Sequence, residues 1–142
     1  MANYEQIGDG IFIGPQPSEQ DLESAKEQGI RTVIDFRMPS ETATLNANLV
    51  SSAGLDYVNV PVNKTALSEQ QIGELDEAMK HNEGPYLLHC ATGTRAAMLL
   101  ALSRAKKNGW TAARTFHEAE SMGFNLRSSV DFSKFVEQTI GK

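Results

Sequence analysis

Residues 86–102 place an apolar run, a short loop and a second apolar run directly after one another. Residues 86–88 predict a buried strand, and residues 96–102 predict a helix that is apolar nearly all round. His89 and Cys90 follow the first run, and a loop with a single glycine leads to the second. Cys90 is the only cysteine of the chain. A strand that passes through a tight loop into a helix creates an anion site, because backbone N–H groups and the helix dipole converge there.

Cys90 and Arg95 give this loop its predicted chemistry. A cysteine beside a helix N-terminus loses its proton easily and becomes a nucleophile. Arg95 adds a permanent charge and a planar fork that fits a tetrahedral oxyanion. We therefore predict that Cys90 and Arg95 are catalytic, although a lone cysteine is often only a small buried apolar residue. The predicted anion-binding residues are Ala91, Thr92, Gly93, Thr94 and Arg95.

Length and composition limit the class of protein. A chain of 142 residues is predicted to form one domain over residues 1–142. The net charge of −5 gives the whole chain no attraction for nucleic acid or an acidic membrane. One cysteine cannot form an internal disulfide, and we find no signal peptide or long apolar span, so a cytoplasmic location is expected.

Strands and helices alternate along the chain. We predict strands at about residues 11–13, 32–34, 57–61 and 86–88. Helices are predicted from Ser18 to Gly29, at 41–53, from Ser68 onward, at 95–107, at 112–122 and around 132–140, with Ser18 and Ser68 as capping residues. Strands separated by helices predict an α/β fold with a mostly parallel central sheet and helices on both faces. The Cys90 loop then lies at the carboxyl end of a strand, where such sheets bind ligands.

The stretch from His89 to Arg95 resembles the signature loop of cysteine-dependent protein phosphatases, His-Cys-x-x-Gly-x-x-Arg-Ser/Thr. It also resembles the active loop of rhodanese-type sulfurtransferases, because four residues separate Cys90 from Arg95, one fewer than in the phosphatases. Cys-x-x-Gly-Thr-Arg loops of this shorter kind occur in the bacterial DUF442 or beta-lactamase-hydrolase-like phosphatases, a group similar to dual-specificity phosphatases, and the chain looks most like that group. Supporting segments that look like the same fold are 13–17, 32–37 and 57–62.

The chain departs from the phosphatase pattern at two positions. Those phosphatases place an aspartate general acid after the proline-containing strand, where this chain has Asn63 followed by Lys64. An amide cannot act as a general acid. Glu69 and Asp76, further along the chain, are alternative acids, but a role as solvated charges on the surface of their helix is favoured. The usual Ser or Thr after the arginine is replaced by Ala96.

Other polar residues have simpler roles. The hydroxyls of Thr92 or Thr94 could replace the one missing at position 96, or could only hydrogen-bond the turn. We expect His89 to support the loop backbone and hold Cys90 rather than to transfer protons. Asp35 and Arg37 could form a second catalytic pair, but a structural role, with Arg37 meeting Glu41 or a loop carboxylate, is favoured.

We therefore expect a cysteine-dependent phosphatase that hydrolyses phosphate monoesters through a phosphocysteine, with aryl or phosphotyrosine-like substrates preferred. Its substrate would be a phosphorylated protein or a small phosphomonoester, and no cofactor or metal is expected. Two alternatives stay open: a sulfurtransferase that carries a persulfide on Cys90, and a non-catalytic domain that binds phosphate. The sequence does not indicate an oligomeric state.

Overall fold

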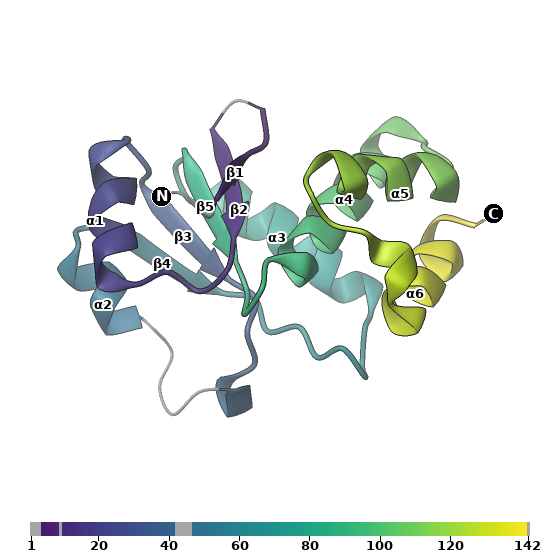
Figure 1. The fold of residues 1–142 in the computed structure, drawn as a ribbon, viewed down its shortest axis with the longest axis horizontal. Coiled ribbons are helices and arrows are strands. Elements are labelled where there is room, and N and C mark those ends of the chain that lie inside the picture. Colours follow the sequence, from purple (N-terminus) through teal and green to yellow (C-terminus); the bar gives the residue numbers. More distant parts are fainter. Residues whose placement is uncertain (1–3, 9, 42–46, 142) are drawn as a thin grey trace.

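The structure is a computed structural model that describes residues 4–8, 10–41 and 47–141. At its centre is a five-stranded sheet with the order β1-β2-β5-β3-β4 (Figure 1). The strands are β1 (Glu5–Gln6), β2 (Ile11–Gly14), β3 (Thr32–Asp35), β4 (Asp56–Asn59) and β5 (Tyr86–His89). β1 pairs antiparallel with β2, and the other neighbouring pairs are parallel. The predicted mostly parallel sheet is therefore confirmed.

The inner strands β3 and β5 are buried because the sheet is covered on both faces. All four residues of β3 are buried, as are three of the four in β5. The register pairs Asp35 of β3 with His89 of β5, Gly14 of β2 with His89, and Asp35 with Asn59 of β4. The carboxyl ends of four strands thus meet at one edge, with the Cys90 loop immediately after the central one.

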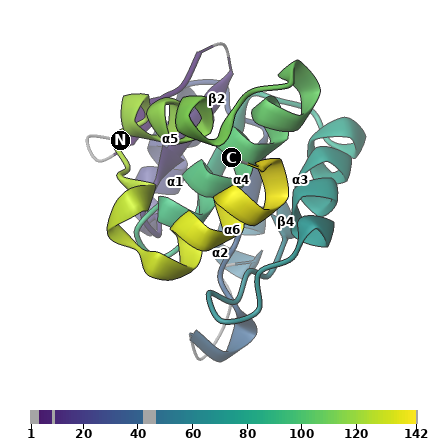
Figure 2. The ribbon, with the colours of Figure 1, turned by 90° about the vertical axis from the view of Figure 1, so that its right-hand side faces the viewer.

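Helices cover the two faces of the sheet unequally (Figure 1). The helices α1 (Glu19–Glu27) and α2 (Ala47–Ser52) pack on one face, around Leu22, Val50 and Leu87. The other face carries α3 (Glu69–His81), α4 (Thr94–Asn108), α5 (Ala112–Ser121) and α6 (Val130–Ile140). The 3-10 helices are η1 (Pro39–Glu41) and η2 (Leu126–Ser128). Figure 2 shows α6 lying over α4, with α5 beside them.

α4 begins at the end of the predicted loop and runs through the core. Its burial covers a continuous stretch of the helix, Ala96 to Ser103, and Ala105, as the apolar sequence predicts. It ends at Gly109, which has φ +67° and donates its N–H to the carbonyl of Ala105. At the start of α1, Ser18 and Asp21 form the predicted reciprocal capping box.

Three segments differ from the sequence prediction. β1 was not predicted, because its two residues are exposed and polar and give no apolar signal. The helix predicted at 41–53 is represented by η1 and the short α2, and residues 42–46 lie outside the described part of the chain. The strand predicted at 57–61 is β4, which begins at Asp56 and ends at Asn59.

Candidate functional site

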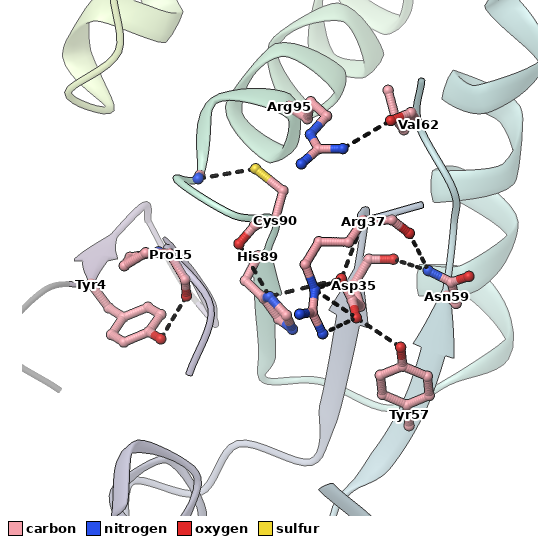
Figure 3. Close-up of polar contacts among 11 residues, drawn as sticks. Tyr4, Pro15, Asp35, Arg37, Tyr57, Asn59, Val62, His89, Cys90 and Arg95 are labelled. Carbon is pink, nitrogen blue, oxygen red and sulfur yellow. Dashed lines mark hydrogen bonds and ion pairs between the residues drawn. The ribbon is translucent and has the colours of Figure 1, made fainter. Parts of the chain in front are cut away.

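Cys90 lies between the end of β5 and the start of α4, at the base of the loop (Figure 3). The residue is 1% exposed, and its Sγ accepts a hydrogen bond from the backbone N–H of Gly93 at 3.0 Å. Cys90 thus belongs to the buried core and at the same time contacts the loop that was predicted around it.

Gly93 allows the loop to turn back over the sulfur. Its φ is +103°, in the left-handed region that side chains disfavour. A Cβ atom there would lie 2.7 Å from Cζ of Phe124 and 3.2 Å from the carbonyl carbon of Gly14. Position 93 is therefore restricted to glycine both by its backbone angle and by lack of space.

The chain that follows β2 supports the opposite side of the loop. The backbone N–H of Gln16 donates to the carbonyl of Ala91 at 3.4 Å. Just before it, the carbonyl of Pro15 accepts a 2.7 Å hydrogen bond from the Tyr4 hydroxyl (Figure 3). The loop is thus held by neighbouring backbone as well as by the helix that follows it.

Arg95 lies in the first turn of α4, and its Nη1 donates to the carbonyl of Val62 at 3.0 Å (Figure 3). Val62 belongs to the segment after β4, so this bond joins the loop to the chain on the other side of an open cleft. The side chain is only partly buried and lines that cleft.

The cleft beside the loop has a volume of about 620 Å³. Three segments form its walls together with the loop: one after β3, one after β4 and one at the start of α6. The described residues that line it are Met38, Ser40, Val62, Asn63, Lys64, Ala91, Thr92, Thr94, Arg95, Ser128, Ser129 and Phe132. Four of the five predicted anion-binding residues thus line one cavity. The fifth, Gly93, donates its backbone N–H to the Cys90 sulfur.

The two loop threonines contact each other. Their Oγ1 atoms are 3.1 Å apart, and the N–H of Thr94 lies 3.5 Å from Oγ1 of Thr92. Ala96, which stands where the phosphatase pattern has a hydroxyl, is fully buried in the first turn of α4. These contacts of the two threonines agree with a role in the turn, and both residues line the cleft.

A buried polar network lies directly beneath Cys90 (Figure 3). Arg37 donates from Nε to Oδ1 of Asp35 at 3.0 Å and from Nη2 to Oδ2 at 2.8 Å. The Tyr57 hydroxyl donates to the same carboxylate at 2.7 Å. Asn59 joins the strand ends, because its Nδ2 donates to the carbonyls of Asp35 and Arg37 at 2.8 and 3.0 Å.

His89 connects this network to the loop. Its Nδ1 is 3.4 Å from the carbonyl oxygen of Cys90 and 3.9 Å from Oδ1 of Asp35. Burial lowers the pKa of His89 to about 4, so the imidazole is neutral at pH 7. These contacts agree with the predicted supporting role, and His89 is not among the described residues that line the cleft.

The charge of Asp35 is stabilised inside the protein. Burial alone would raise the pKa of its carboxyl, but the hydrogen bonds from Arg37, the neighbouring His89 and the Tyr57 hydroxyl together hold this pKa below its ordinary value. Burial and the hydrogen bond to Asp35 raise the pKa of Tyr57, which remains a neutral donor.

Asp35 and Arg37 pair with each other, which agrees with the structural role that the sequence favoured. The expected contact of Arg37 with Glu41 or a loop carboxylate stays a prediction for Glu41, because the side chain of Glu41 lies outside the described residues. Neither Asp35 nor Arg37 lines the cleft.

The carboxylates considered as replacement acids lie away from the cleft. Glu69 pairs with Lys106, and Asp76 accepts from the Ser103 hydroxyl at 2.6 Å and lies 3.3 Å from Lys107. Neither is among the described residues that line the cleft, whereas Asn63 is.

Within the described chain we find no group of His, Cys, Asp or Glu side chains arranged to hold a metal ion. None of the described helices has the length and apolar character needed to cross a bilayer.

Comparison with known sequences places this site in a family. Residues 3–107 match the family described as "Beta-lactamase hydrolase-like protein, phosphatase-like domain". The chain belongs to this family. A beta-lactamase hydrolase-like protein of Xylella fastidiosa is 30% identical to it over 133 residues, which are 90% of this chain. The same alignment covers 31% of the Xylella protein, so this phosphatase-like domain spans less than a third of that relative.

Solved structures share the fold of this phosphatase-like domain. A candidate phosphatase from Neisseria meningitidis is 23% identical with a TM-score of 0.79, over 95% of this chain and 96% of that one. TpbA of P. aeruginosa, solved in complex with phosphotyrosine, is 16% identical with a TM-score of 0.70, over 96% and 93% of the two chains. The fold is therefore that of the protein-tyrosine and dual-specificity phosphatases, as the sequence resemblance implied.

Several residues that shape the cleft gave no signal in the sequence. Phe132 fell only within the helix predicted around residues 132–140, yet it also lines the cleft. Lys64 was noted only as the neighbour of Asn63, and Val62 only as part of a strand. Each gains its position from the packing of α6 and the segment after β4 against the loop, which local sequence does not reveal.

Proposed function

We propose that this phosphatase-like domain is a cysteine-dependent phosphatase that hydrolyses phosphate monoesters through a phosphocysteine, with aryl phosphates such as phosphotyrosine preferred. Cys90 attacks phosphorus in line. Arg95 and the backbone N–H groups of residues 91–95 hold the equatorial oxygens, where negative charge accumulates. Water then hydrolyses the phosphocysteine and releases phosphate.

The observation that carries this proposal is the position of the Cys90 sulfur. It accepts a 3.0 Å hydrogen bond from Gly93 at the N-terminus of α4, at the base of a loop that opens into the 620 Å³ cleft. A thiolate, a converging set of N–H groups and a guanidinium together make a site for a tetrahedral dianion.

The comparisons support the same reaction class. The family is described as phosphatase-like, and TpbA, which shares the fold, was solved with phosphotyrosine bound. The preference for aryl esters rests on this chain's own residues, because an amide at position 63 cannot protonate a poor leaving group.

One observation favours a second candidate, a sulfurtransferase. Only four residues separate Cys90 from Arg95, which is the loop length typical of the rhodanese pattern. In that reaction Cys90 would carry a persulfide, steadied by the same N–H groups.

A side-by-side assay of the purified protein separates the candidates. We expect phosphate release from an aryl phosphate and no thiocyanate from thiosulfate and cyanide. Thiocyanate formation without phosphate release would contradict the phosphatase function and support the sulfurtransferase function instead. Phosphate binding with neither product would leave a domain that only binds phosphate.

A further inference from the structure

The cleft opposite the Cys90 loop contains one feature that the phosphatase pattern does not explain. In an in-line displacement the leaving oxygen departs on the side of phosphorus opposite the attacking sulfur. A phosphate held by the loop therefore points its leaving oxygen into the cleft. The residues on the far walls of the cleft decide what meets this oxygen.

Those walls carry a cation where the phosphatases carry an acid. Among the described residues that line the cleft, the charged ones are Lys64 and Arg95, and both are positive. Arg95 belongs to the loop that holds the phosphate. Lys64 comes from the segment after β4, where the general acid is expected in this fold.

The fold presents Lys64 in a defined way. The carbonyl of Asn63 accepts from the N–H of Ala66 at 2.9 Å, and its side-chain Oδ1 accepts from the N–H and hydroxyl of Thr65 at 2.9 and 2.8 Å. These bonds close a tight turn with Lys64 at its first inner position. Asn63 thus shapes the turn that carries the neighbouring lysine.

Phe132 provides the second constraint. The Lys64 ammonium lies 5.7 Å from the centroid of the Phe132 ring, within the range of a cation–π contact. Phe132 is 6% exposed and lies in the first turn of α6, where the Ser129 side chain accepts from its backbone N–H. The ring is therefore a fixed surface, and it keeps the ammonium on the wall of the cleft.

We infer that Lys64 is a further catalytic residue of this domain, whose ammonium donates a hydrogen bond to the leaving oxygen as the ester bond breaks. This inference rests on the proposed phosphatase activity. The S–P bond forms, the P–O bond breaks, and the leaving group departs as an oxyanion bound to the ammonium. The oxyanion then takes its proton from water, and Lys64 stays charged throughout.

The size of the effect follows from the exposure of Lys64. A rigid, buried donor to a developing oxyanion contributes about 10²–10³-fold in rate, and an exposed lysine such as Lys64 contributes less, roughly tenfold. The contribution grows with the negative charge on the leaving oxygen, so it is greatest for leaving groups of high pKa.

The test compares wild type with Lys64→Met and Lys64→Arg on a series of aryl phosphates whose leaving groups span a wide pKa range. Lys134→Met is the matched control. Lys134 lines a neighbouring hollow of about 200 Å³ together with Lys64, but it is not among the described residues of the cleft.

We expect Lys64→Met to lose kcat/KM roughly tenfold for the poorest leaving group and less than about twofold for the best, so that the dependence on leaving-group pKa becomes steeper. Lys64→Arg should retain most of the rate, and Lys134→Met should match wild type throughout. An equal loss for every leaving group, or no loss, would overturn the role of Lys64 while the phosphatase stands.

A rival role for Lys64 is to bind a second anionic group of the substrate. In that case Lys64→Met would raise KM for a doubly phosphorylated ester and leave kcat/KM for simple aryl phosphates unchanged, which would contradict our inference. A wild-type protein that releases no phosphate from any aryl ester would instead refute the proposed function itself.

Discussion

The Arg37 guanidinium and the Asp35 carboxylate form a two-point ion pair inside the protein, directly beneath the Cys90 loop. The two contacts measure 3.0 and 2.8 Å, and both side chains are at most 2% exposed. A pair of this kind is costly to break, because the remaining charge stays buried without compensation. The loop is therefore built on a charged but closed network rather than on an apolar floor.

Asp35→Asn should lower the free energy of unfolding by about 3–5 kcal/mol, because it removes the buried carboxylate charge that Arg37 contacts at two points. Denaturant unfolding followed by circular dichroism measures this change. The control is Glu83→Gln, which removes the exposed Arg31–Glu83 ion pair of 3.1 Å and should cost less than about 1 kcal/mol. Equal effects of the two substitutions would show that burial gives the Asp35 pair no special weight.

His89 should make the protein less stable in mild acid. The pKa of His89 is about 4 in the folded protein, against the ordinary value of 6.5 that applies to the unfolded chain. Between these pH values the unfolded chain therefore binds the proton more strongly. Stability should therefore be constant above about pH 6.5 and fall towards pH 4, by about 3 kcal/mol in all from this residue.

Unfolding curves measured across pH 4–7 test the His89 contribution. His89→Asn should flatten the pH dependence in this window, because it removes the group whose pKa burial lowers to about 4. Asp35 should also make the protein less stable at more acid pH, because its carboxyl pKa is lowered in the folded state. The stability that its charged form contributes is lost as pH falls below the ordinary range for an aspartate. Curves for wild type and His89→Asn that remain parallel would contradict the assigned pKa.

Gly93→Ala should damage the site more than its backbone angle alone explains. Any residue with a Cβ is strained at φ +103°, by about 1–2 kcal/mol, and here the Cβ would also meet Phe124 at 2.7 Å. Gly109→Ala is the control, because Gly109 has φ +67° with no atom within 4 Å of the added Cβ. We expect both variants to lose stability and only Gly93→Ala to lose phosphate binding by calorimetry. Unchanged phosphate affinity in Gly93→Ala would mean that the loop does not need this geometry.

Asn63 predicts the substrate preference. Without a carboxylic acid at this position, kcat/KM should fall steeply as the leaving-group pKa rises, and alkyl phosphates such as phosphoserine should be slow. Asn63→Asp should help poor leaving groups more than good ones, provided that the turn at residues 63–66 is kept. A flat leaving-group dependence in wild type would show that another group supplies a proton.

The sequence predicted the elements whose signal is local. The strand–loop–helix around Cys90, the caps at Ser18 and Gly109, and the apolar α4 all follow from residue types and spacing, and the structure contains them. The exposed strand β1 could not be predicted, because Glu5 and Gln6 carry no apolar pattern and pair only by tertiary contact with β2.

The relationships within the site were harder to predict. The sequence favoured a structural role for Asp35 and Arg37, but the contact with His89 depends on the register of β3 with β5. The Lys64–Phe132 contact depends on how α6 packs beside the segment after β4. Neither register nor helix packing is specified by the residues next to these side chains.

The most direct test of the account is to trap the covalent intermediate. Wild-type protein turning over an aryl phosphate should be quenched under denaturing, alkaline conditions, and the peptide that contains Cys90 examined by mass spectrometry. We predict one phosphoryl group on Cys90 in wild type and none in Cys90→Ser, which should lose turnover yet still bind phosphate, because N–H groups and Arg95 form the site. An unmodified Cys90 during turnover, or a Cys90→Ser protein that still turns over, would contradict the central claim that Cys90 is the nucleophile.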